Sequence, residues 1–397
     1  MTERSRWLLP EGIEELLPQQ AEHLERLRRQ VLDLFHRWGY ELVLTPLTEY
    51  IESLLIGRGD DLDLQTYKLI DQLSGRLMGV RADITPQVAR IDSHHLKRQA
   101  PTRLCYVGPV LHTRPAGLAA SREPIQVGAE LYGHGGIESD IEIIHLMVET
   151  LRTTGVSNIH LDLGHVAIFR SLAQEAGLAD KQEAMLFDAM QRKAKPEMSA
   201  MLREFKLNDA WRDIFLTLVD LNGSEEVLQE AGRLLRSRSG AVQDALARLG
   251  LISAAVRRRL EGVPLHFDLA ELRGYRYKTG IVFAAFAPGH GQELARGGRY
   301  DEVSGVYGTA RPATGFSADL KTLIRLSGES PYQVRAILAP YLDDSALDNL
   351  VGELRSKGER VVSALPGQAG SACELGCDRE LKLVSGVWCV VPLSGTH

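Results

Sequence analysis

Cysteines are scarce in this chain and long apolar runs are absent, and each absence excludes a class of protein. Only four cysteines occur among the 397 residues. They match no Cys-x2-Cys zinc spacing, so we expect reduced thiols and neither a metal nor a cofactor. The first residues lack the apolar core of a signal peptide, and no apolar run approaches the ~20 residues that cross a bilayer. The sequence therefore predicts a cytoplasmic protein without a membrane segment.

Basic residues are not in excess either. The net charge is −6 and the isoelectric point is about 6.1, whereas a nucleic-acid-binding domain usually carries a basic face. The local run of arginines at residues 257–259 is a candidate basic patch, but a solvated helix face is the favoured interpretation. The hydrophobic content of 44% and charged content of 25% are typical of a globular protein. The length predicts two to three domains at ~150 residues each.

Periodic apolar residues predict a helix and then a strand near the start of the chain. Residues 21–38 repeat apolar side chains at three- and four-residue steps and close on Gly39, as an amphipathic helix does. Residues 41–46 are then expected to form a strand that ends at Pro46. Two strands are predicted within residues 67–80. Further strands are expected at residues 103–110, 124–132, 159–163, 265–268, 280–286 and 313–317, and a helix at residues 139–154.

The character of the sequence changes twice along the chain, which predicts two domains and an insertion. Residues from about 169 to 262 are mostly helical in pattern and lie between strand-rich halves, so we interpret them as a helical insertion. Residues 329–397 predict a separate small α/β domain. Its expected strands lie at residues 334–340, 360–365 and 387–392, and its helix at residues 345–357. The first domain is therefore expected to span residues 1–328, with the insertion inside it.

Two neighbouring segments carry a pattern found in adenylate-forming enzymes. Residues 106–114 (YVGPVLHTR) and 122–130 (REPIQVGAE) resemble motif 2 of the histidyl-tRNA synthetases. In that family an arginine and a glutamate stand where this chain has His112 and Arg114. The helix and strand of residues 21–46 are similar to motif 1, which implies a dimer interface, although any helix–strand unit fits this pattern taken alone. The resemblance implies an α+β, class II synthetase-like fold, with an antiparallel sheet flanked by helices.

Four polar residues around motif 2 are candidates for binding an amino acid. Asp83 and Thr85 form an acid-x-Thr element, in which an acid pairs with an ammonium and a hydroxyl adds a directional hydrogen bond. Gln126 and Glu130 are four residues apart, so they point to the same face of a strand. Gly128 between them allows a ligand to approach closely. The alternatives are a strand end with a turn for the first pair and an exposed polar face for the second.

A third segment, residues 272–283 (LRGYRYKTGIVF), is similar to the histidine-specific signature of the synthetases. In that family the signature arginine lies beside the carboxylate of histidine and a tyrosine reaches the imidazole. Arg273 and Tyr277 match these two positions, whereas Lys278 stands in place of a second tyrosine. Residues 297–301 (GGRYD) follow in the family order and imply a glycine-rich wall of the site.

The motif 3 frame at residues 312–323 lacks its phosphate-binding arginine. Thr322 occupies the arginine position and Asp319 replaces a glycine. Lys321 or Arg325 could substitute from a neighbouring position, but one step along a helix turns a side chain by about 100°. Loss of one charge-stabilising donor costs on the order of 10²–10³ in rate, and here His112 and Thr322 replace two arginines. His112 is mostly neutral at pH 7, so we expect no aminoacyl-tRNA synthesis.

A synthetase-like chain with these losses resembles the regulatory-subunit family of short-form ATP phosphoribosyltransferase, which catalyses the first step of histidine biosynthesis. The resemblance implies a partner, the short catalytic chain, in a hetero-oligomer that is typically an octamer. It also implies that the catalytic chain needs this subunit for full activity and that L-histidine acts through it as a feedback effector. Binding of tRNA is not expected. The expected histidine-binding residues are Asp83, Thr85, Gln126, Glu130, Arg273 and Tyr277, and the lost ATP-site positions are His112, Arg114 and Thr322.

Two alternatives stay open. The chain could be an active but divergent histidyl-tRNA synthetase, for which exchange of pyrophosphate into ATP in the presence of histidine would be the signature. It could also be a tRNA-binding regulatory module without catalysis, which a gel shift with tRNA would detect. The acidic isoelectric point and the two lost arginines disfavour the first.

Overall fold

The computed structural model describes residues 7–55, 60–115, 117, 121–270, 277–327 and 335–393. Two compact units divide the chain. The large unit comprises Met1–Glu15 and Leu24–Gly328, and the small unit comprises Leu16–His23 and Glu329–His397. Within the described residues no helix is both long enough and apolar enough to cross a membrane.

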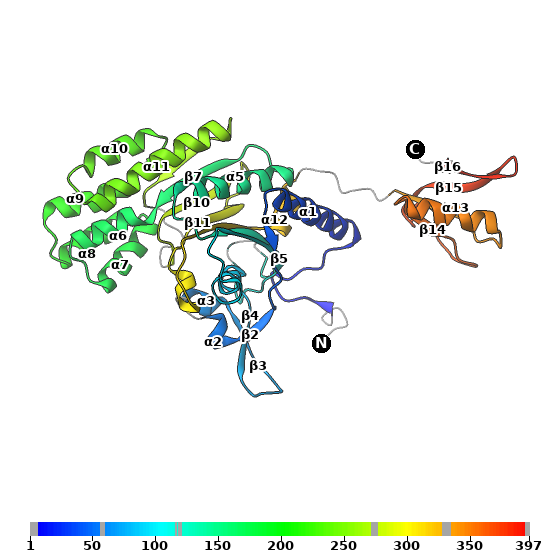
Figure 1. The fold of residues 1–397 in the computed structure, drawn as a ribbon, viewed down its shortest axis with the longest axis horizontal. Coiled ribbons are helices and arrows are strands. Elements are labelled where there is room, and N and C mark those ends of the chain that lie inside the picture. The colour runs from blue at the N-terminus through cyan, green and yellow to red at the C-terminus, as the bar shows by residue number, and fades with distance from the viewer. Residues whose placement is uncertain are drawn as a thin grey trace. The chain divides into compact units, whose positions relative to one another are not determined.

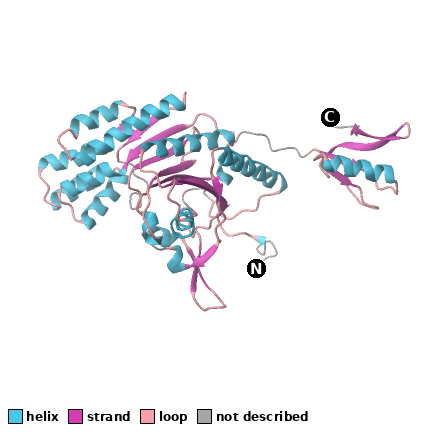
Figure 2. Ribbon diagram, viewed as in Figure 1, coloured by secondary structure: helices cyan, strands magenta, loops and turns pink. Residues whose placement is uncertain are grey.

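Nine strands of the large unit form one sheet in the order β1-β5-β6-β12-β11-β10-β7-β9-β8 (Figures 1 and 2). From β5 to β7 every neighbouring pair is antiparallel, whereas β1 pairs with β5 and β7 with β9 in parallel. The strands are β1 (Glu41–Leu42), β5 (Thr102–Pro109), β6 (Ile125–Tyr132), β7 (His160–His165), β8 (Asn222–Gly223), β9 (Leu265–Asp268), β10 (Ile281–Phe286), β11 (Ala295–Arg299) and β12 (Ala313–Asp319). The predicted α+β class with an antiparallel central sheet is confirmed.

Helices α1 (Pro18–Arg37) and α5 (Ile137–Thr153) pack against one face of this sheet. Phe35 of α1 meets Phe316 of β12 edge to face, with ring centroids 6.1 Å apart. The apolar residues that predicted α1 are buried, as the 3.6-residue period requires. The predicted strand after α1 is shorter than expected. Val43 still donates its backbone N–H to the carbonyl of Cys105 in β5, but the carbonyl of Thr45 accepts a hydrogen bond from Arg81 at 2.8 Å instead of pairing in the sheet.

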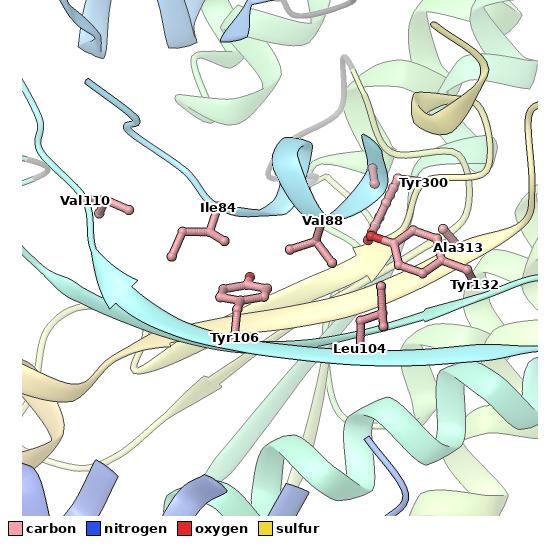
Figure 3. Packing of buried hydrophobic residues seen from close by; sticks show 9 residues of the cluster. Ile84, Val88, Leu104, Tyr106, Val110, Tyr132, Tyr300 and Ala313 are labelled. Carbon is pink, nitrogen blue, oxygen red and sulfur yellow. The ribbon is translucent and has the colours of Figure 1, made fainter. Parts of the chain in front are cut away.

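The other face of the sheet is covered in part by the segment that joins a small second sheet to β5. This sheet has the order β2-β4-β3, from β2 (Thr48–Tyr50), β3 (Tyr67–Ile70) and β4 (Leu77–Val80), with the short helices α2 (Ile51–Leu54) and α3 (Asp60–Gln65) beside it. Helix α4 (Thr85–Arg90), the π-helical turn η2 (Ile91–Leu96) and the 3-10 turn η3 (Val303–Tyr307) complete this layer. Figure 3 shows Leu104 and Tyr106 of β5 pointing toward Ile84 and Val88, which pack with them in one buried cluster.

Six helices occupy the region predicted to be a helical insertion, and Figure 1 shows them gathered at one end of the large unit. They are α6 (Val166–Glu175), α7 (Asp180–Gln191), α8 (Lys195–Glu204), α9 (Asp209–Leu218), α10 (Glu226–Leu234) and α11 (Gly240–Arg259). Phe169 packs against Phe187 and Phe215 in their core. Strand β8 was not predicted, and its two residues attach this helical region to the sheet edge through β9. The last helix of the large unit is α12 (Leu320–Leu326).

The C-terminal part of the small unit has a four-stranded sheet in the order β14-β13-β15-β16, and the helix α13 (Ser345–Ser356) packs on it. Its strands are β13 (Ala336–Ala339), β14 (Val361–Ser363), β15 (Cys377–Val384) and β16 (Val387–Pro392). Leu347 and Val351 of α13 pack on Ile337 and Leu381 of the sheet. β15 was not predicted, because four of its eight residues are charged and it lacks an apolar alternation. The elements that were predicted for this unit, namely three strands and one helix, are present as β13, β14, β16 and α13.

Candidate functional site

A buried carboxyl group marks the open face of the central sheet. Glu130 of β6 is 1% exposed, and its carboxyl group lies over Gly315 of β12, where a Cβ would be 1.5 Å from Oε2. Thr85 and Tyr106 each donate a hydroxyl hydrogen bond to Oε1 at 3.1 Å, and the hydroxyl of Tyr300 donates to Oε2. Burial raises the pKa of Glu130 to about 8, although the hydrogen bonds from these three hydroxyls lower it. The group is therefore largely protonated near neutral pH.

A second pair of polar side chains is fixed next to this group. The Gln126 amide donates to Asp83 Oδ1 at 2.8 Å, and its carbonyl oxygen accepts from the backbone N–H of Ile84 at 2.9 Å. Asp83 Oδ1 also accepts the backbone N–H of Thr85 at 3.1 Å, at the start of α4. Asp83, Thr85, Gln126 and Glu130, all predicted from the sequence, thus lie in one hydrogen-bonded site. Their role toward a ligand stays a prediction.

The other two predicted binding residues come from the histidine-signature segment. Arg273 lies outside the described residues. Tyr277 lies on the turn before β10 and is 36% exposed. Its neighbour Lys278 is 5% exposed, and the Lys278 ammonium donates a hydrogen bond to the carbonyl of Gly297.

A shallow, open pocket lies on the same face of the sheet, beyond Lys278. Its floor is built by β7 and β10, whose residues Gly164 and Val282 are cross-strand neighbours. Lys278 and Arg296 line it on the β11 side, and Asp162 lines it on the β7 side. Lys278 therefore stands between the Glu130 cluster and the pocket.

Asp319 and Thr322, in the segment predicted to correspond to motif 3, form hydrogen bonds with each other and with their neighbours. Asp319 is the N-cap of α12: Oδ1 accepts the N–H of Lys321 at 3.1 Å, and Oδ2 accepts the N–H of Thr322 at 3.2 Å and its hydroxyl at 2.8 Å. Oδ1 also accepts the N–H of Ile125 at 2.9 Å. The start of α12, where unpaired N–H groups would attract an anion, is therefore closed by a carboxylate of the same chain.

Apart from Arg114, the remaining candidates at this end are also engaged. His112 Nε2 lies 2.8 Å from the carbonyl oxygen of Ala82, which assigns it the proton, and Arg114 is exposed. The two cations considered as substitutes pair with the chain's own carboxylates: Lys321 Nζ lies 3.5 Å from Glu123, and Arg325 pairs with Glu14. Among the described residues, no group of three His, Cys, Asp or Glu side chains has the geometry to hold a metal ion.

Comparisons with known proteins show the family of this chain. The histidyl-tRNA synthetase family model matches residues 12–323, and the model of the ATP phosphoribosyltransferase subunit HisZ C-terminal domain matches residues 334–391. The ATP phosphoribosyltransferase regulatory subunit of Thioalkalivibrio sulfidiphilus is 62% identical over 96% of this chain and 97% of its own length. That of Alkalilimnicola ehrlichii is 56% identical over 98% of each chain. This chain belongs to the ATP phosphoribosyltransferase regulatory subunit family.

Solved structures place this family member among the histidyl-tRNA synthetase-like folds. A crystal structure described as an ATP phosphoribosyltransferase regulatory subunit/histidyl-tRNA synthetase from Bacillus halodurans matches with a TM-score of 0.83 and 25% identity, over 94% of this chain and 97% of that one. The histidyl-tRNA synthetase of Nostoc matches with a TM-score of 0.78 and 17% identity, over 97% of both chains, which shows the fold alone. The predicted class II synthetase-like fold is confirmed.

Two tyrosines of this regulatory-subunit chain belong to the site and were not predicted from the sequence. Tyr106 is paired across the strands with Gly128, whose absent Cβ would lie 2.4 Å from the tyrosine hydroxyl. Tyr300 follows β11 and also lies 3.3 Å from the hydroxyl of Tyr132. A sequence signal existed for Tyr106, because it lies in the motif 2-like segment and that segment pairs with the strand of Gly128 and Glu130. Tyr300 lay in the segment expected to form a wall of the site.

The cap at Asp319 predicts a local loss of stability when it is removed. Replacing an N-cap Asp by Ala costs about 1 kcal/mol, and Asp319→Ala would also remove the acceptor of the Ile125 N–H, so we expect a free energy of unfolding lowered by about 1–3 kcal/mol. Urea unfolding measures this. Asn208→Ala is the matched control, because the Asn208 side chain caps α9 through the N–H of Trp211, three residues further along the chain. Equal losses in the two variants would contradict the extra role of Asp319.

The raised pKa of Glu130 predicts a stability that falls with pH. Its pKa is about 8 in the folded chain and 4.5 for an ordinary glutamic acid. Below pH 4.5 both states hold the proton. Between pH 4.5 and 8 the unfolded chain has released the proton that the folded chain keeps, so the free energy of unfolding falls by up to about 1.4 kcal/mol per pH unit. Above pH 8 the fall ends.

Urea unfolding of the wild type and of Glu130→Gln at pH 5 to 9 checks this dependence. Glutamine has no proton to release, so the wild type is expected to lose stability relative to the variant as the pH rises from 5 to 8. A stability difference that stays constant across this range would refute the assignment of a raised pKa to Glu130.

Proposed function

We propose that this chain is the regulatory subunit of a short-form ATP phosphoribosyltransferase, the first step of L-histidine biosynthesis. In this proposal it is required for full activity of the catalytic chain, carries feedback by histidine and performs no aminoacylation of its own. The observation that carries the proposal is the contrast within one site. An amino-acid end is preserved as a hydrogen-bonded network around Glu130, and the phosphate end is capped by Asp319.

The chemistry of the preserved end suits histidine. Asp83 offers a carboxylate to the ammonium of the ligand, and Thr85 adds a hydroxyl. Gln126 is held in one orientation by Ile84 and Asp83, so its amide is preorganised rather than free to rotate. Glu130 provides a buried partner for an imidazole nitrogen. The resemblance to the histidyl-tRNA synthetases implies two further contacts, from Arg273 to the ligand carboxylate and from Tyr277 to the imidazole.

The phosphate end supports the absence of aminoacylation. Adenylate formation develops charge at a transferring phosphoryl centre, which enzymes stabilise with positioned arginines and metal ions. His112 and Thr322 stand at the two arginine positions, and the Asp319 carboxylate would repel a phosphate. Lys321 is held by Glu123. We expect no measurable pyrophosphate exchange, and measurable exchange in the presence of histidine would favour the divergent synthetase instead.

Regulation requires assembly with the catalytic chain. The names of the curated relatives, which are called regulatory subunits, support such an assembly. We expect a hetero-octamer in which the regulatory chains pair as dimers through the motif 1-like helix and strand. Leu42, Leu44 and Leu47 of this region are 49%, 80% and 47% exposed, which supports burial in such an interface. Histidine inhibits only as far as it binds one state of the complex more tightly than the other, with coupling of typically ~1–3 kcal/mol.

Co-expression with a short-form catalytic chain tests the proposal directly. Phosphoribosyl transfer from phosphoribosyl pyrophosphate to ATP is measured for the catalytic chain alone and for the purified complex, each with and without histidine. We expect a gain of activity in the complex and its loss on addition of histidine. No gain over the catalytic chain alone would overturn the regulatory role. Activation that histidine leaves unchanged would overturn the effector role alone.

A further inference from the structure

Arg299 is a buried arginine on the face of the central sheet that α5 covers. It is the last residue of β11 and is 4% exposed. Its Nε donates to Asp140 Oδ2 at 3.1 Å in the first turn of α5, and its Nη2 donates to Ser139 Oγ at 2.8 Å. Its Nη1 donates to Asp301 Oδ1 at 3.1 Å, and two carbonyl groups just before α5 accept at 3.2 and 3.0 Å. All three nitrogen atoms of the guanidinium group are therefore engaged.

Stability alone explains this ion pair poorly. Asp140 is as buried as Arg299, and removing two opposite charges from water costs free energy that their attraction only partly offsets. Two apolar side chains of similar size often stabilise a fold as well as such a pair does. What an apolar pair lacks is the directional hydrogen bonding of the guanidinium fork, which fixes the groups that it joins. The network at Arg299 therefore points to a requirement for geometry.

Tyr300 is the side chain next to this network in the sequence. It lies in the buried cluster on the opposite, open face of the sheet, where its hydroxyl donates to Glu130 Oε2 (Figure 3). The Tyr300 N–H donates to the carbonyl of Ala313 at 2.8 Å, and the Ala313 N–H donates to Asp301 Oδ1 at 3.0 Å. The carboxylate oxygen that accepts from Arg299 thus also holds the chain just beyond the tyrosine.

The backbone on both sides of Tyr300 is also bound to the segment that resembles the histidine signature. Thr279 of this segment donates its N–H to the carbonyl of Arg299 at 2.8 Å, and its Oγ1 accepts the N–H of Asp301 at 3.0 Å. The tyrosine therefore lies between two residues that are each held twice. The Arg299 side chain is the connection from this point to α5.

We propose that Arg299 is a positioning residue of the histidine site: paired with Asp140, it holds Tyr300 in the direction in which the tyrosine hydroxyl reaches Glu130. The inference rests on the proposed histidine site at Glu130. Two other hydroxyls donate to Oε1 of this carboxyl group, whereas Tyr300 donates to Oε2 and so fixes its rotation. A ligand then meets a carboxyl group of one orientation, and no binding free energy is lost in ordering it.

A double-variant cycle on histidine affinity tests the inference. The dissociation constant of L-histidine is measured by calorimetry on the assembled complex for the wild type, Arg299→Lys, Tyr300→Phe and the double variant. We expect Tyr300→Phe to weaken binding about tenfold, because Glu130 loses its donor at Oε2. Arg299→Lys should weaken binding about fivefold, because an ammonium cannot reproduce the fork that joins Asp140 to Asp301. The double variant should bind like Tyr300→Phe alone, whereas independent effects would multiply to about 50-fold.

Urea unfolding of the same proteins separates positioning from a merely structural role. Asp140→Asn repeats the cycle from the other end of the ion pair, so that misfolding of one variant does not end the test. A merely structural role would lower the free energy of unfolding and leave the histidine affinity of the folded complex as in the wild type. That result would overturn the inference, and so would an effect on affinity that multiplies with that of Tyr300→Phe.

Arg103→Met is the matched control for loss of an ion pair between the sheet and α5. Arg103 pairs with Glu142 of α5 at 2.7 Å, and two strands separate its own strand, β5, from β11. The histidine affinity of this variant should stay within about twofold of the wild type. A loss as large as that of Arg299→Lys would assign both effects to loosening of α5 and would overturn the inference. Absence of histidine binding to the wild-type complex would overturn the effector site, and this inference with it, before any variant is compared.

Discussion

Glu130→Gln is expected to release the complex from feedback by histidine while leaving its activation intact. Glutamine keeps the size of the side chain but replaces the protonated carboxyl group by an amide, which cannot accept from Thr85, Tyr106 and Tyr300 in the same way. A buried donor left without its acceptor costs ~1–3 kcal/mol, so the histidine concentration for half inhibition should rise by about 5- to 150-fold. Inhibition curves of phosphoribosyl transfer measure this shift.

A matched carboxyl group on the helical side of the sheet provides the control. Glu142 of α5 also accepts a tyrosine hydroxyl, from Tyr40 at 2.9 Å, and pairs with Arg103 at 2.7 Å. Glu142→Gln therefore removes comparable interactions away from the proposed site, and its inhibition curve should match that of the wild type. Similar shifts in both variants would mean that Glu130 acts through stability and not through the ligand. An unchanged curve for Glu130→Gln would remove Glu130 from the site.

Gly315→Ala is the second substitution with a large expected effect. The new Cβ would lie 1.5 Å from Glu130 Oε2 and 2.8 Å from the carbonyl oxygen of Ala129, so the carboxyl group must leave its place. Overpacking of this kind typically costs ~1–3 kcal/mol, and displacement of Glu130 also leaves three hydroxyls without their acceptor. We expect a free energy of unfolding lowered by about 2–4 kcal/mol and loss of histidine inhibition.

Gly250→Ala is the control for the added methyl group. Gly250 lies inside α11 with no atom within 4 Å of the Cβ position, and alanine is favoured over glycine in a helix by about 1 kcal/mol. This variant should be slightly more stable than the wild type and fully inhibited by histidine. Urea unfolding and inhibition assays of the two variants separate the steric effect at Gly315 from the general effect of the substitution. A Gly315→Ala protein as stable as the wild type would contradict the described packing.

The amino-acid end of the site could be predicted because its signals are local. Gln126 and Glu130 share a face through the two-residue period of one strand, and Asp83 and Thr85 belong to one short segment. That the two pairs meet was expected only from the resemblance, and the hydrogen bond between Gln126 and Asp83 bears it out. The partners of Glu130 were harder to predict, because Tyr300 reaches it from a segment 170 residues away.

Cross-strand register explains most of what the sequence missed. The place of the Glu130 carboxyl group depends on the pairing of Glu130 with Gly315, which no local pattern specifies. Strand β11, Ala295–Arg299, contains two glycines and two arginines and has little intrinsic strand propensity, so its place in the sheet comes from its two neighbours. The role of Asp319 as an N-cap was available from the sequence, since an aspartate before an apolar helical segment is a helix-start signal.

The cap at Asp319 also bears on how readily such a chain could regain a nucleotide site. Arginine at position 322 alone would remove the hydroxyl that Asp319 accepts and would leave the carboxylate at the helix start. Glycine at position 319 alone would free the N–H groups of Lys321, Thr322 and Ile125 at the expense of the cap. Each single step thus lowers stability before any phosphate contact is gained. The same four hydrogen bonds that order this corner of the fold therefore oppose the gain of a phosphate site by single substitutions.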